Sequence, residues 1–107
     1  MPHCIVEYSA NLEADLSPRK LIRRIYDAIV ATGVYPLGGV RVRAARRDVY
    51  IVADGDPENA FVAVLIRMGQ GRDEATRRRV SQEVLAALAD ETSDSFARRG
   101  LSLSVEI

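Results

Sequence analysis

One short pattern occurs twice along this chain and leaves few folds open to it. Each time, a segment with the apolar spacing of an amphipathic helix is followed by a glycine and an alternating strand, at Gly39–Arg43 (GVRVR) and at Gly100–Ser104 (GLSLS). The apolar positions coincide in the two copies, and arginines in the first copy stand where serines stand in the second. This match indicates a duplicated β-α-β unit. We therefore expect a single domain over residues 1–107, with approximate halves 1–56 and 57–107.

The first half is predicted to begin with a strand and a long helix. Residues 3–9 (HCIVEYS) alternate in the manner of a half-buried strand. Ser17 stands at the N-cap position with Pro18 at the first helical position, and Gly33 is expected to end the helix. The strand should turn one face to the core, formed by Cys4, Val6 and Tyr8. The helix carries one apolar row, formed by Leu21, Ile25 and Ile29.

A hairpin and a buried strand are predicted to follow. Alternation at Val40 and Val42, and again over residues 49–53, predicts two strands joined by a turn at residues 46–48. The nearly continuous apolar run at residues 59–69 is typical of a central strand that is buried on both faces.

A second helix and a closing strand complete the predicted elements. The helix opens at Asp73 and Glu74, where acidic residues complement the helix dipole. We expect it to run on to Phe96 and to stop at Gly100. Residues 101–107 (LSLSVEI) alternate as a final strand. The apolar row of this helix is formed by Val80, Val84 and Leu88.

Together these elements predict an α+β fold built from duplicated β-α-β units. Parallel pairing within each unit forms a four-stranded sheet with two helices on one face, plus a short hairpin. The other face of the sheet still carries apolar side chains. An uncovered apolar face on a small domain predicts self-association.

Charge and cysteine content exclude several classes of function. Lys plus Arg and Asp plus Glu number 15 each, so the net charge provides no attraction to nucleic acid or to an acidic membrane. No apolar run approaches the roughly 18 residues of a membrane span. Cys4 is the only cysteine, which excludes an internal disulfide and suits a reducing cytoplasm. His3 and Cys4 would point to opposite faces of a strand, so we expect no metal site.

The proline at position 2 has a structural and a chemical interpretation. Proline is tolerated at the first position of a strand because no ladder donor is needed there. If Met1 is removed, however, Pro2 becomes the amino terminus and its ring nitrogen is a secondary amine. A free α-amine has a pKa of about 7.7–8.0, and burial or nearby guanidinium charge would lower that pKa. Such a group accepts and then donates a proton near neutral pH.

Three arginines are candidates for binding an anionic substrate. Arg41 and Arg43 alternate on a strand, where they also suit an ordinary solvent-facing side. Arg72 precedes a helix start, where a cation opposes the dipole and a compensating anion or role is expected. The planar guanidinium binds a carboxylate in two places and stays charged at any working pH. The remaining candidates are expected to serve packing or an exposed helix face: His3, Cys4, Tyr8, Tyr35 and Arg77–Arg79.

Several stretches together resemble one known family. They are MPHCIVEYS at the start, ATGVYPLGGVRVR after the first helix, MGQGR before the second helix and LSVEI at the end. In this order and at these spacings the chain is similar to the 5-carboxymethyl-2-hydroxymuconate isomerase family of the tautomerase superfamily. The resemblance spans residues 1–107. It implies duplicated β-α-β units assembled as homotrimers, and a cofactor-free enol–keto isomerase of aromatic-acid degradation.

The resemblance also implies roles for named residues. Pro2 would move the proton, and Arg41 and Arg72 would bind and polarise the carboxylate and oxygen groups of the substrate. Arg43 aligns with a further substrate-binding arginine of the same strand. The implied partners are a small carboxylate substrate and two further copies of the chain, and the implied reaction needs no cofactor. The family's chains continue beyond LSVEI, so we expect the end at Ile107 to bear on subunit contacts.

Other functions suit the same residues. Another keto acid such as phenylpyruvate, or a haloacrylate, would need the same proline base and carboxylate clamp. A non-catalytic trimeric module would use the same pocket to bind dicarboxylates. A nucleic-acid role for RVRAARR is a third alternative, although the net charge is zero and no groove-reading motif is present.

Overall fold

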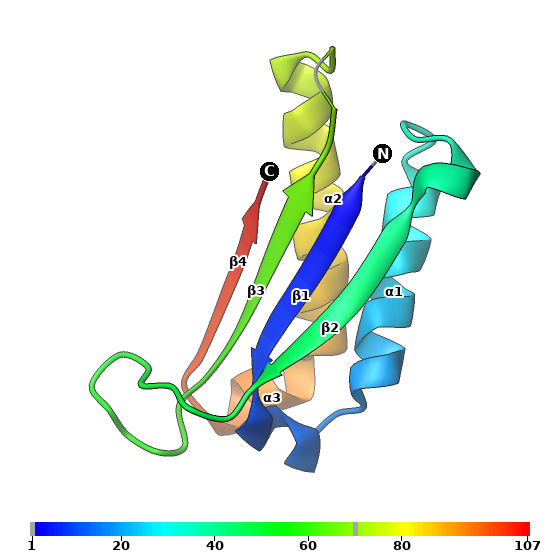
Figure 1. Ribbon diagram of the computed structural model, residues 1–107. Coiled ribbons are helices and arrows are strands. Elements are labelled where there is room, and N and C mark those ends of the chain that lie inside the picture. The colour runs from blue at the N-terminus through cyan, green and yellow to red at the C-terminus, as the bar shows by residue number, and fades with distance from the viewer. Residues whose placement is uncertain (1, 70) are drawn as a thin grey trace.

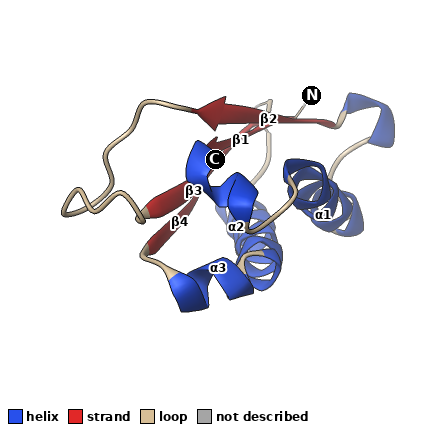
Figure 2. Cartoon of the chain, turned by 90° about the horizontal axis from the view of Figure 1, so that it is seen from below, coloured by secondary structure: helices blue, strands red, loops and turns tan. Residues whose placement is uncertain are grey.

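The structure, a computed structural model, describes residues 2–69 and 71–107 as one four-stranded sheet with its helices on a single face (Figures 1 and 2). The strands, in spatial order, are β2 (Arg41–Arg47), β1 (His3–Ser9), β3 (Ala60–Arg67) and β4 (Leu101–Glu106). The helical elements are η1 (Ala10–Ala14), α1 (Pro18–Ala31), η2 (Leu37–Gly39), α2 (Glu74–Glu91) and α3 (Ser93–Arg98). Met1 and Gln70 lie outside the described residues. The expected removal of Met1 and the Gln70 position of the MGQGR motif therefore also fall outside them.

The predicted fold of duplicated β-α-β units is confirmed. β2 pairs with β1 and β4 pairs with β3, both in parallel, and an antiparallel β1–β3 pair joins the two units. The register is equivalent in the two units, since His3 pairs with Arg41 as Phe61 pairs with Ser102. Arg41 and Ser102, which match in sequence, therefore occupy matching places in the sheet.

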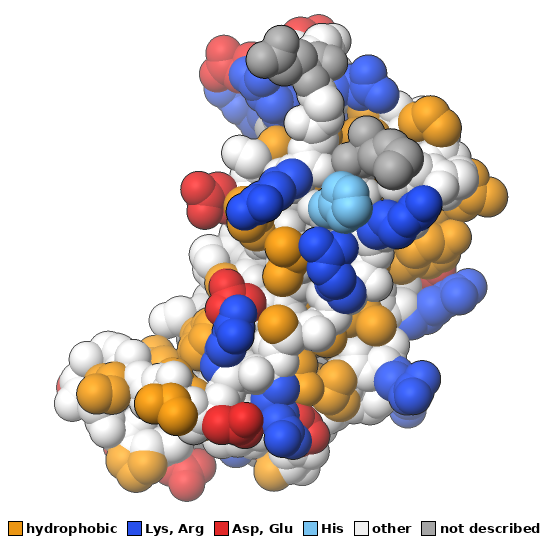
Figure 3. Space-filling model, in the orientation of Figure 1, with side chains coloured by type: hydrophobic (Ala, Val, Ile, Leu, Met, Phe, Trp, Pro, Cys, Tyr) orange, Lys and Arg blue, Asp and Glu red, His pale blue; other side chains and the backbone are white. Residues whose placement is uncertain are grey.

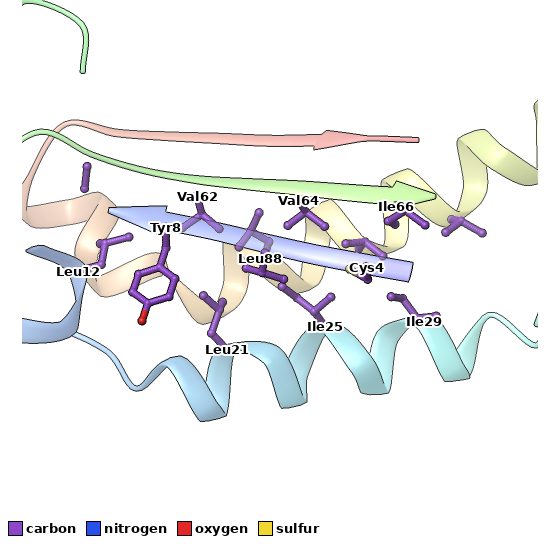
Figure 4. Packing of buried hydrophobic residues seen from close by; sticks show 14 residues of the cluster. Cys4, Tyr8, Leu12, Leu21, Ile25, Ile29, Val62, Val64, Ile66 and Leu88 are labelled. Carbon is purple, nitrogen blue, oxygen red and sulfur yellow. The ribbon is translucent and has the colours of Figure 1, made fainter. Parts of the chain in front are cut away.

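The hydrophobic core fills the layer between the sheet and the two long helices. The predicted faces of the first strand and the first helix are confirmed, because each contributes fully buried side chains to this layer. Figure 4 shows side chains of the sheet packing against side chains of the two long helices. The sheet contributes Cys4, Val62, Val64 and Ile66, and the helices contribute Leu21, Ile25, Ile29 and Leu88. The periodicity of these residues decides which face of the sheet the helices cover.

Both predicted helix starts are confirmed by their caps. The Oγ atom of Ser17 accepts from the backbone N–H of Lys20 at 3.4 Å. The carboxylate of Asp73 accepts from the backbone N–H of Thr76 at 2.7 Å. α1 ends at Ala31, and Gly33 follows with φ of 68°, a conformation that glycine adopts without steric cost.

The predicted second strand of the hairpin does not form. Residues 48–59, all of which the structure describes, contain no strand and project from the sheet as a loop (Figure 1). Val49 is 96% exposed and Ile51 is 87% exposed. The alternation is present, but within residues 2–69 and 71–107 no strand pairs with this segment to complete a ladder.

Two further expectations were wrong in part. The second helix does not run on unbroken, because α2 ends at Glu91 and a shorter helix, α3, begins at Ser93. The hydroxyl of Thr92 donates to the carbonyl of Leu88 at 2.8 Å across this break. β3 is fully buried on one face only, since its alternate residues are half-buried.

The face of the sheet away from the helices is uncovered, as predicted. Ile5 and Leu65 pair across the two central strands on this face and are half-buried. Figure 3 shows hydrophobic side chains lying among Lys and Arg side chains on this side of the molecule. Among the described residues, no helix is both long enough and apolar enough to cross a membrane.

Candidate active site

Pro2 lies at the end of the sheet where the N-terminal strand begins. It is buried, and its carbonyl oxygen accepts from the backbone N–H of Arg41 at 3.1 Å. Figure 1 shows this end of β1 between the loop that follows β3 and the turn that precedes β2. The sheet therefore holds Pro2 by its main chain, directly beside two connecting segments.

A cavity of about 480 Å³ opens beside Pro2. Its walls come from four parts of the chain: the N-terminus, the segment between α1 and β2, the loop after β3, and the residue that precedes the N-cap of α2. The lining residues are Pro2, Tyr35, Pro36, Gly38, Gly39, Met68, Gly69 and Arg72. Two of the predicted site residues, Pro2 and Arg72, thus meet in one cavity although 70 positions separate them in the sequence.

Arg72 is held in place by contacts with the segment after α1. Its Nη2 atom donates to the carbonyl of Val34 at 3.3 Å, and its guanidinium carbon lies 5.7 Å from the centroid of the Tyr35 ring. Its Nε atom is buried and has no hydrogen-bond partner in residues 2–69 and 71–107. A half-buried guanidinium with a buried, unused Nε donor suits the binding of an anion.

Tyr35 lines the cavity, whereas the sequence favoured packing for this residue. Its hydroxyl lies 3.3 Å from the sulfur of Met68, across the cavity wall. Burial raises the pKa of Tyr35 above its ordinary value, while the Arg72 charge opposes that shift. The phenol is therefore neutral near pH 7 and can donate a hydrogen bond. The signal that could have found it is its place within ATGVYPLGG, one of the stretches that carry the family resemblance.

Arg41 and Arg43 do not line the Pro2 cavity of their own chain. Arg41 is exposed, and its Nη1 atom donates to the carbonyls of Gly38 at 2.8 Å and Val40 at 3.3 Å. It supports the η2 turn from outside, while Gly38 lines the cavity from within. The Nη1 atom of Arg43 lies 3.2 Å from Nδ1 of His3. Both arginines line a different cavity, between α1 and β2.

The remaining candidates lie away from the Pro2 cavity. Cys4 is 1% exposed, and burial raises the pKa of its thiol to about 12, with the charge of Arg43 opposing. Tyr8 is 5% exposed, and its hydroxyl donates to Glu13 at 2.9 Å. Arg77–Arg79 lie on the exposed face of α2, as expected. These residues serve the core and the surface.

The comparisons with known proteins agree over the whole chain. Residues 2–107 match the family described as 5-carboxymethyl-2-hydroxymuconate isomerase. The sequence is 31% identical over 107 residues to the 5-carboxymethyl-2-hydroxymuconate Delta-isomerase of Escherichia coli, covering 100% of this chain and 85% of that protein.

Two crystal structures resemble the fold closely. A 5-carboxymethyl-2-hydroxymuconate delta-isomerase superposes with a TM-score of 0.90 at 30% identity, covering 98% of this chain and 80% of that one. A 5-carboxymethyl-2-hydroxymuconate isomerase from Deinococcus radiodurans R1 superposes with a TM-score of 0.86 at 34% identity, covering 99% and 82% of the two chains.

Proposed function

Since this chain belongs to the 5-carboxymethyl-2-hydroxymuconate isomerase family, we propose that it is a cofactor-independent enol–keto isomerase. Its substrate is an unsaturated hydroxy di- or tricarboxylic acid such as 5-carboxymethyl-2-hydroxymuconate, an intermediate of aromatic-acid degradation. The observation that carries the proposal is the shared cavity of Pro2 and Arg72. A proton-transfer group and a carboxylate ligand are the two parts that this reaction requires.

Pro2 moves the proton once Met1 has been removed. The secondary amine takes the proton from the enol oxygen, so that the O–H bond breaks and a carbonyl forms. It returns the proton to a distant carbon of the conjugated chain, where a C–H bond forms and the double bonds shift. The ring limits the directions of the nitrogen, so little freedom is lost on reaction. Burial beside Arg72 disfavours the ammonium form and supports a base at neutral pH.

Arg72 binds the substrate and stabilises the charge that develops on it. While the proton is on Pro2, negative charge spreads over the dienolate oxygen and the adjacent carboxylate. A guanidinium that is already fixed by Val34 and Tyr35 stabilises this charge without rearranging. The neutral hydroxyl of Tyr35 offers a further donor on the same wall. The reaction moves one proton and shifts electrons within the substrate, so it consumes no cofactor.

We propose that Arg41 and Arg43 bind substrate carboxylates in the site of an adjacent copy. In their own chain both guanidinium groups lie outside the Pro2 cavity, at the start of the edge strand β2. A homotrimer, which the family resemblance implies, would place this edge against a neighbour. The uncovered sheet face, with Ile5 and Leu65 half-buried, supports association. The buried, unpaired Cys4 supports a cytoplasmic location.

The proposal is tested by following ketonisation of the dienol by ultraviolet absorbance against pH. The protein used is a preparation whose intact mass shows that Met1 is absent. We expect a rate well above that of buffer, which rises through one pKa at or below about 8. Pro2→Ala should lower kcat by about 100-fold or more and leave the circular dichroism spectrum unchanged. An unchanged rate in this variant would overturn the mechanism.

A further inference from the structure

The hydroxyl of Tyr35 is a hydrogen-bond donor that the proposed proton transfer leaves without a stated task. It donates to the sulfur of Met68 at 3.3 Å, and both residues line the cavity together with Pro2 and Arg72. A thioether sulfur is a weak acceptor. The donor is therefore paired with a poor partner, at the wall of a cavity that the proposed substrate would fill with oxygen atoms.

Another tyrosine of this chain shows how a phenol is paired when its role is structural. The hydroxyl of Tyr8 donates to the carboxylate of Glu13 at 2.9 Å, and a carboxylate is among the strongest acceptors in proteins. The hydroxyl of Tyr35 has the sulfur of Met68 in the corresponding place. An oxygen of a bound substrate would therefore be a better acceptor than the one that Tyr35 has in the empty cavity.

The ring of Tyr35 is held in place from several directions. It packs against the hydrophobic core, and the guanidinium carbon of Arg72 lies 5.7 Å from its centroid. The next residue is Pro36, which restricts the backbone of Tyr35 to extended conformations. The preceding carbonyl, that of Val34, accepts from Arg72 at 3.3 Å. The hydroxyl hydrogen therefore needs only to rotate about the C–O bond to change its acceptor.

Arg72 and Tyr35 suit two adjacent groups of one substrate. The planar fork of Arg72 matches a carboxylate, whereas a phenol offers one hydrogen bond to one oxygen. Burial raises the pKa of Tyr35, so the phenol keeps its proton near pH 7. The oxygen on C2 of the substrate, beside the carboxylate, gains negative charge when Pro2 removes its proton. A hydrogen bond to a charged acceptor is the stronger one, so a donor at this oxygen stabilises the dienolate more than the enol.

We propose that the hydroxyl of Tyr35 leaves the sulfur of Met68 when substrate binds and donates to the C2 oxygen of the substrate, while Arg72 holds the adjacent carboxylate. The inference rests on the proposed function for the identity of the substrate, and within that function it makes Tyr35 a catalytic residue. The phenol keeps its proton throughout, so no bond to Tyr35 forms or breaks, and Pro2 still carries the proton from oxygen to carbon.

The first test measures binding, so that it does not depend on proton transfer at Pro2. The probes are 2-oxoadipate and adipate, which share both carboxylates and differ only in the oxygen on C2. Titration calorimetry of the wild type should show about tenfold tighter binding of 2-oxoadipate. Tyr35→Phe keeps the ring beside Arg72, so it should abolish this preference and change the Kd of adipate by less than about twofold. Equal binding of both diacids by the wild type, no measurable binding of either, or a parallel loss of both in the variant would overturn the proposal.

Two control variants separate the hydrogen bond of Tyr35 from the packing around it. Met68→Leu removes the sulfur acceptor but keeps a side chain of similar volume, so the preference for 2-oxoadipate should stay within about threefold of wild type. Tyr50→Phe is the matched control outside the cavity. It removes a hydroxyl from a ring that packs against Phe61, 6.0 Å between centroids, and should leave the preference unchanged. Loss of the preference in either control would overturn the assignment of the C2 oxygen to Tyr35.

The second test combines spectroscopy with turnover. The chain contains four tyrosines and no tryptophan, so its near-ultraviolet absorbance reports the tyrosines. Binding of 2-oxoadipate should shift this absorbance to longer wavelength in the wild type and not in Tyr35→Phe. In ketonisation, Tyr35→Phe should lower kcat by about 10- to 100-fold and change KM less, because the bond strengthens in the dienolate.

The two tests distinguish a failure at Tyr35 from a failure of the proposed function. An unchanged kcat in Tyr35→Phe, with Pro2→Ala inactive, would overturn the role of Tyr35 and leave the isomerase mechanism standing. A fully active Pro2→Ala would overturn the mechanism at Pro2. A binding preference that Tyr35→Phe abolishes would still support the contact between the phenol and the C2 oxygen.

Discussion

Arg72 illustrates at the scale of one residue how a polar side chain is prepared for a ligand. It stands before a helix N-terminus, where a cation is unfavourable. Contacts with the carbonyl of Val34 and the face of Tyr35 compensate in part. A substrate anion bound beside Arg72 offsets what remains of this unfavourable interaction between the guanidinium and the helix dipole.

The first prediction concerns this guanidinium. Arg72→Ala should lower kcat/KM for ketonisation by about 100- to 1,000-fold, because a preorganised charge opposite the dienolate is lost. Arg72→Lys should recover only part of the rate, since an ammonium lacks the planar fork. Arg79→Ala is the control. Arg79 also contacts the end of α1, through the carbonyl of Thr32 at 3.0 Å, but it does not line the cavity. Equal losses in the two alanine variants would contradict the role of Arg72.

At the scale of the element, α2 depends on one ionised cap. The carboxylate of Asp73 accepts from the hydroxyl and from the backbone N–H of Thr76, and these two hydrogen bonds hold the pKa of the carboxyl below the ordinary 3.8. A lowered pKa in the folded state means that the stabilising effect is complete above pH 3.8. It is lost as the pH falls through the lower, folded-state pKa.

The second prediction follows from this cap. Asp73→Ala should lower the melting temperature at pH 7, and its difference from wild type should shrink as the pH falls below 3.8. Asp73→Asn retains an acceptor that does not titrate, so its stability should not share this pH dependence. Thermal unfolding by circular dichroism between pH 2.5 and 7 measures both differences. A pH-independent difference for the alanine variant would show that the charge contributes nothing.

At the scale of the whole molecule, ion pairs join the two β-α-β units. Arg99 near the end of α3 contacts Asp15 at 3.0 Å, with side chains 10% and 8% exposed. Arg24 of α1 contacts Asp90 of α2 at 3.4 Å, with side chains 42% and 73% exposed. Both ion pairs connect the same two halves of the chain, but they differ in burial. A comparison of their contributions to the free energy of unfolding therefore tests the effect of burial alone.

The third prediction compares these pairs. Arg99→Ala should lower the free energy of unfolding by about 1.5–3 kcal/mol, because it removes a charge-assisted contact between two nearly buried side chains. Arg24→Ala should cost less than about 1 kcal/mol, since water screens an exposed pair. Urea denaturation of both variants gives the comparison. Similar costs for the two variants would show that the position of Arg99 between the halves, rather than its burial, matters.

The fourth prediction concerns a site shared between copies. Pro2→Ala and Arg41→Ala should each be nearly inactive alone. When the two are unfolded, mixed in equal amounts and refolded together, about a quarter of the wild-type activity should return. This is the fraction of sites that combine an intact Pro2 with an intact Arg41 from the next copy after random assembly. Mixing that restores no activity would place Arg41 in the site of its own chain, or outside any site.

The loop of residues 48–59 shows where prediction from local pattern fails. Residues 49–53 have the alternation of a strand, and the sequence signal is the same as in β1 or β4. A strand, however, is completed by hydrogen bonds to a neighbouring strand, and the part of the chain that the structure describes places no strand beside this segment. A helix is different because its hydrogen bonds close within the segment, so α1 and the start of α2 could be predicted from caps and periodicity.

The order of residues alone determines the strands β1 and β4, the two long helices and the covered face of the sheet. The signals are helix caps, apolar periods of two and 3.6 residues, and the repeated GVRVR and GLSLS patterns, and each of them acts within a few positions. The candidate chemistry of Pro2 and the arginines also follows from residue type. Only the tertiary structure decides that Arg72 shares a cavity with Pro2 while Arg41 and Arg43 face elsewhere. That choice depends on where distant segments meet, and no local pattern carries this information.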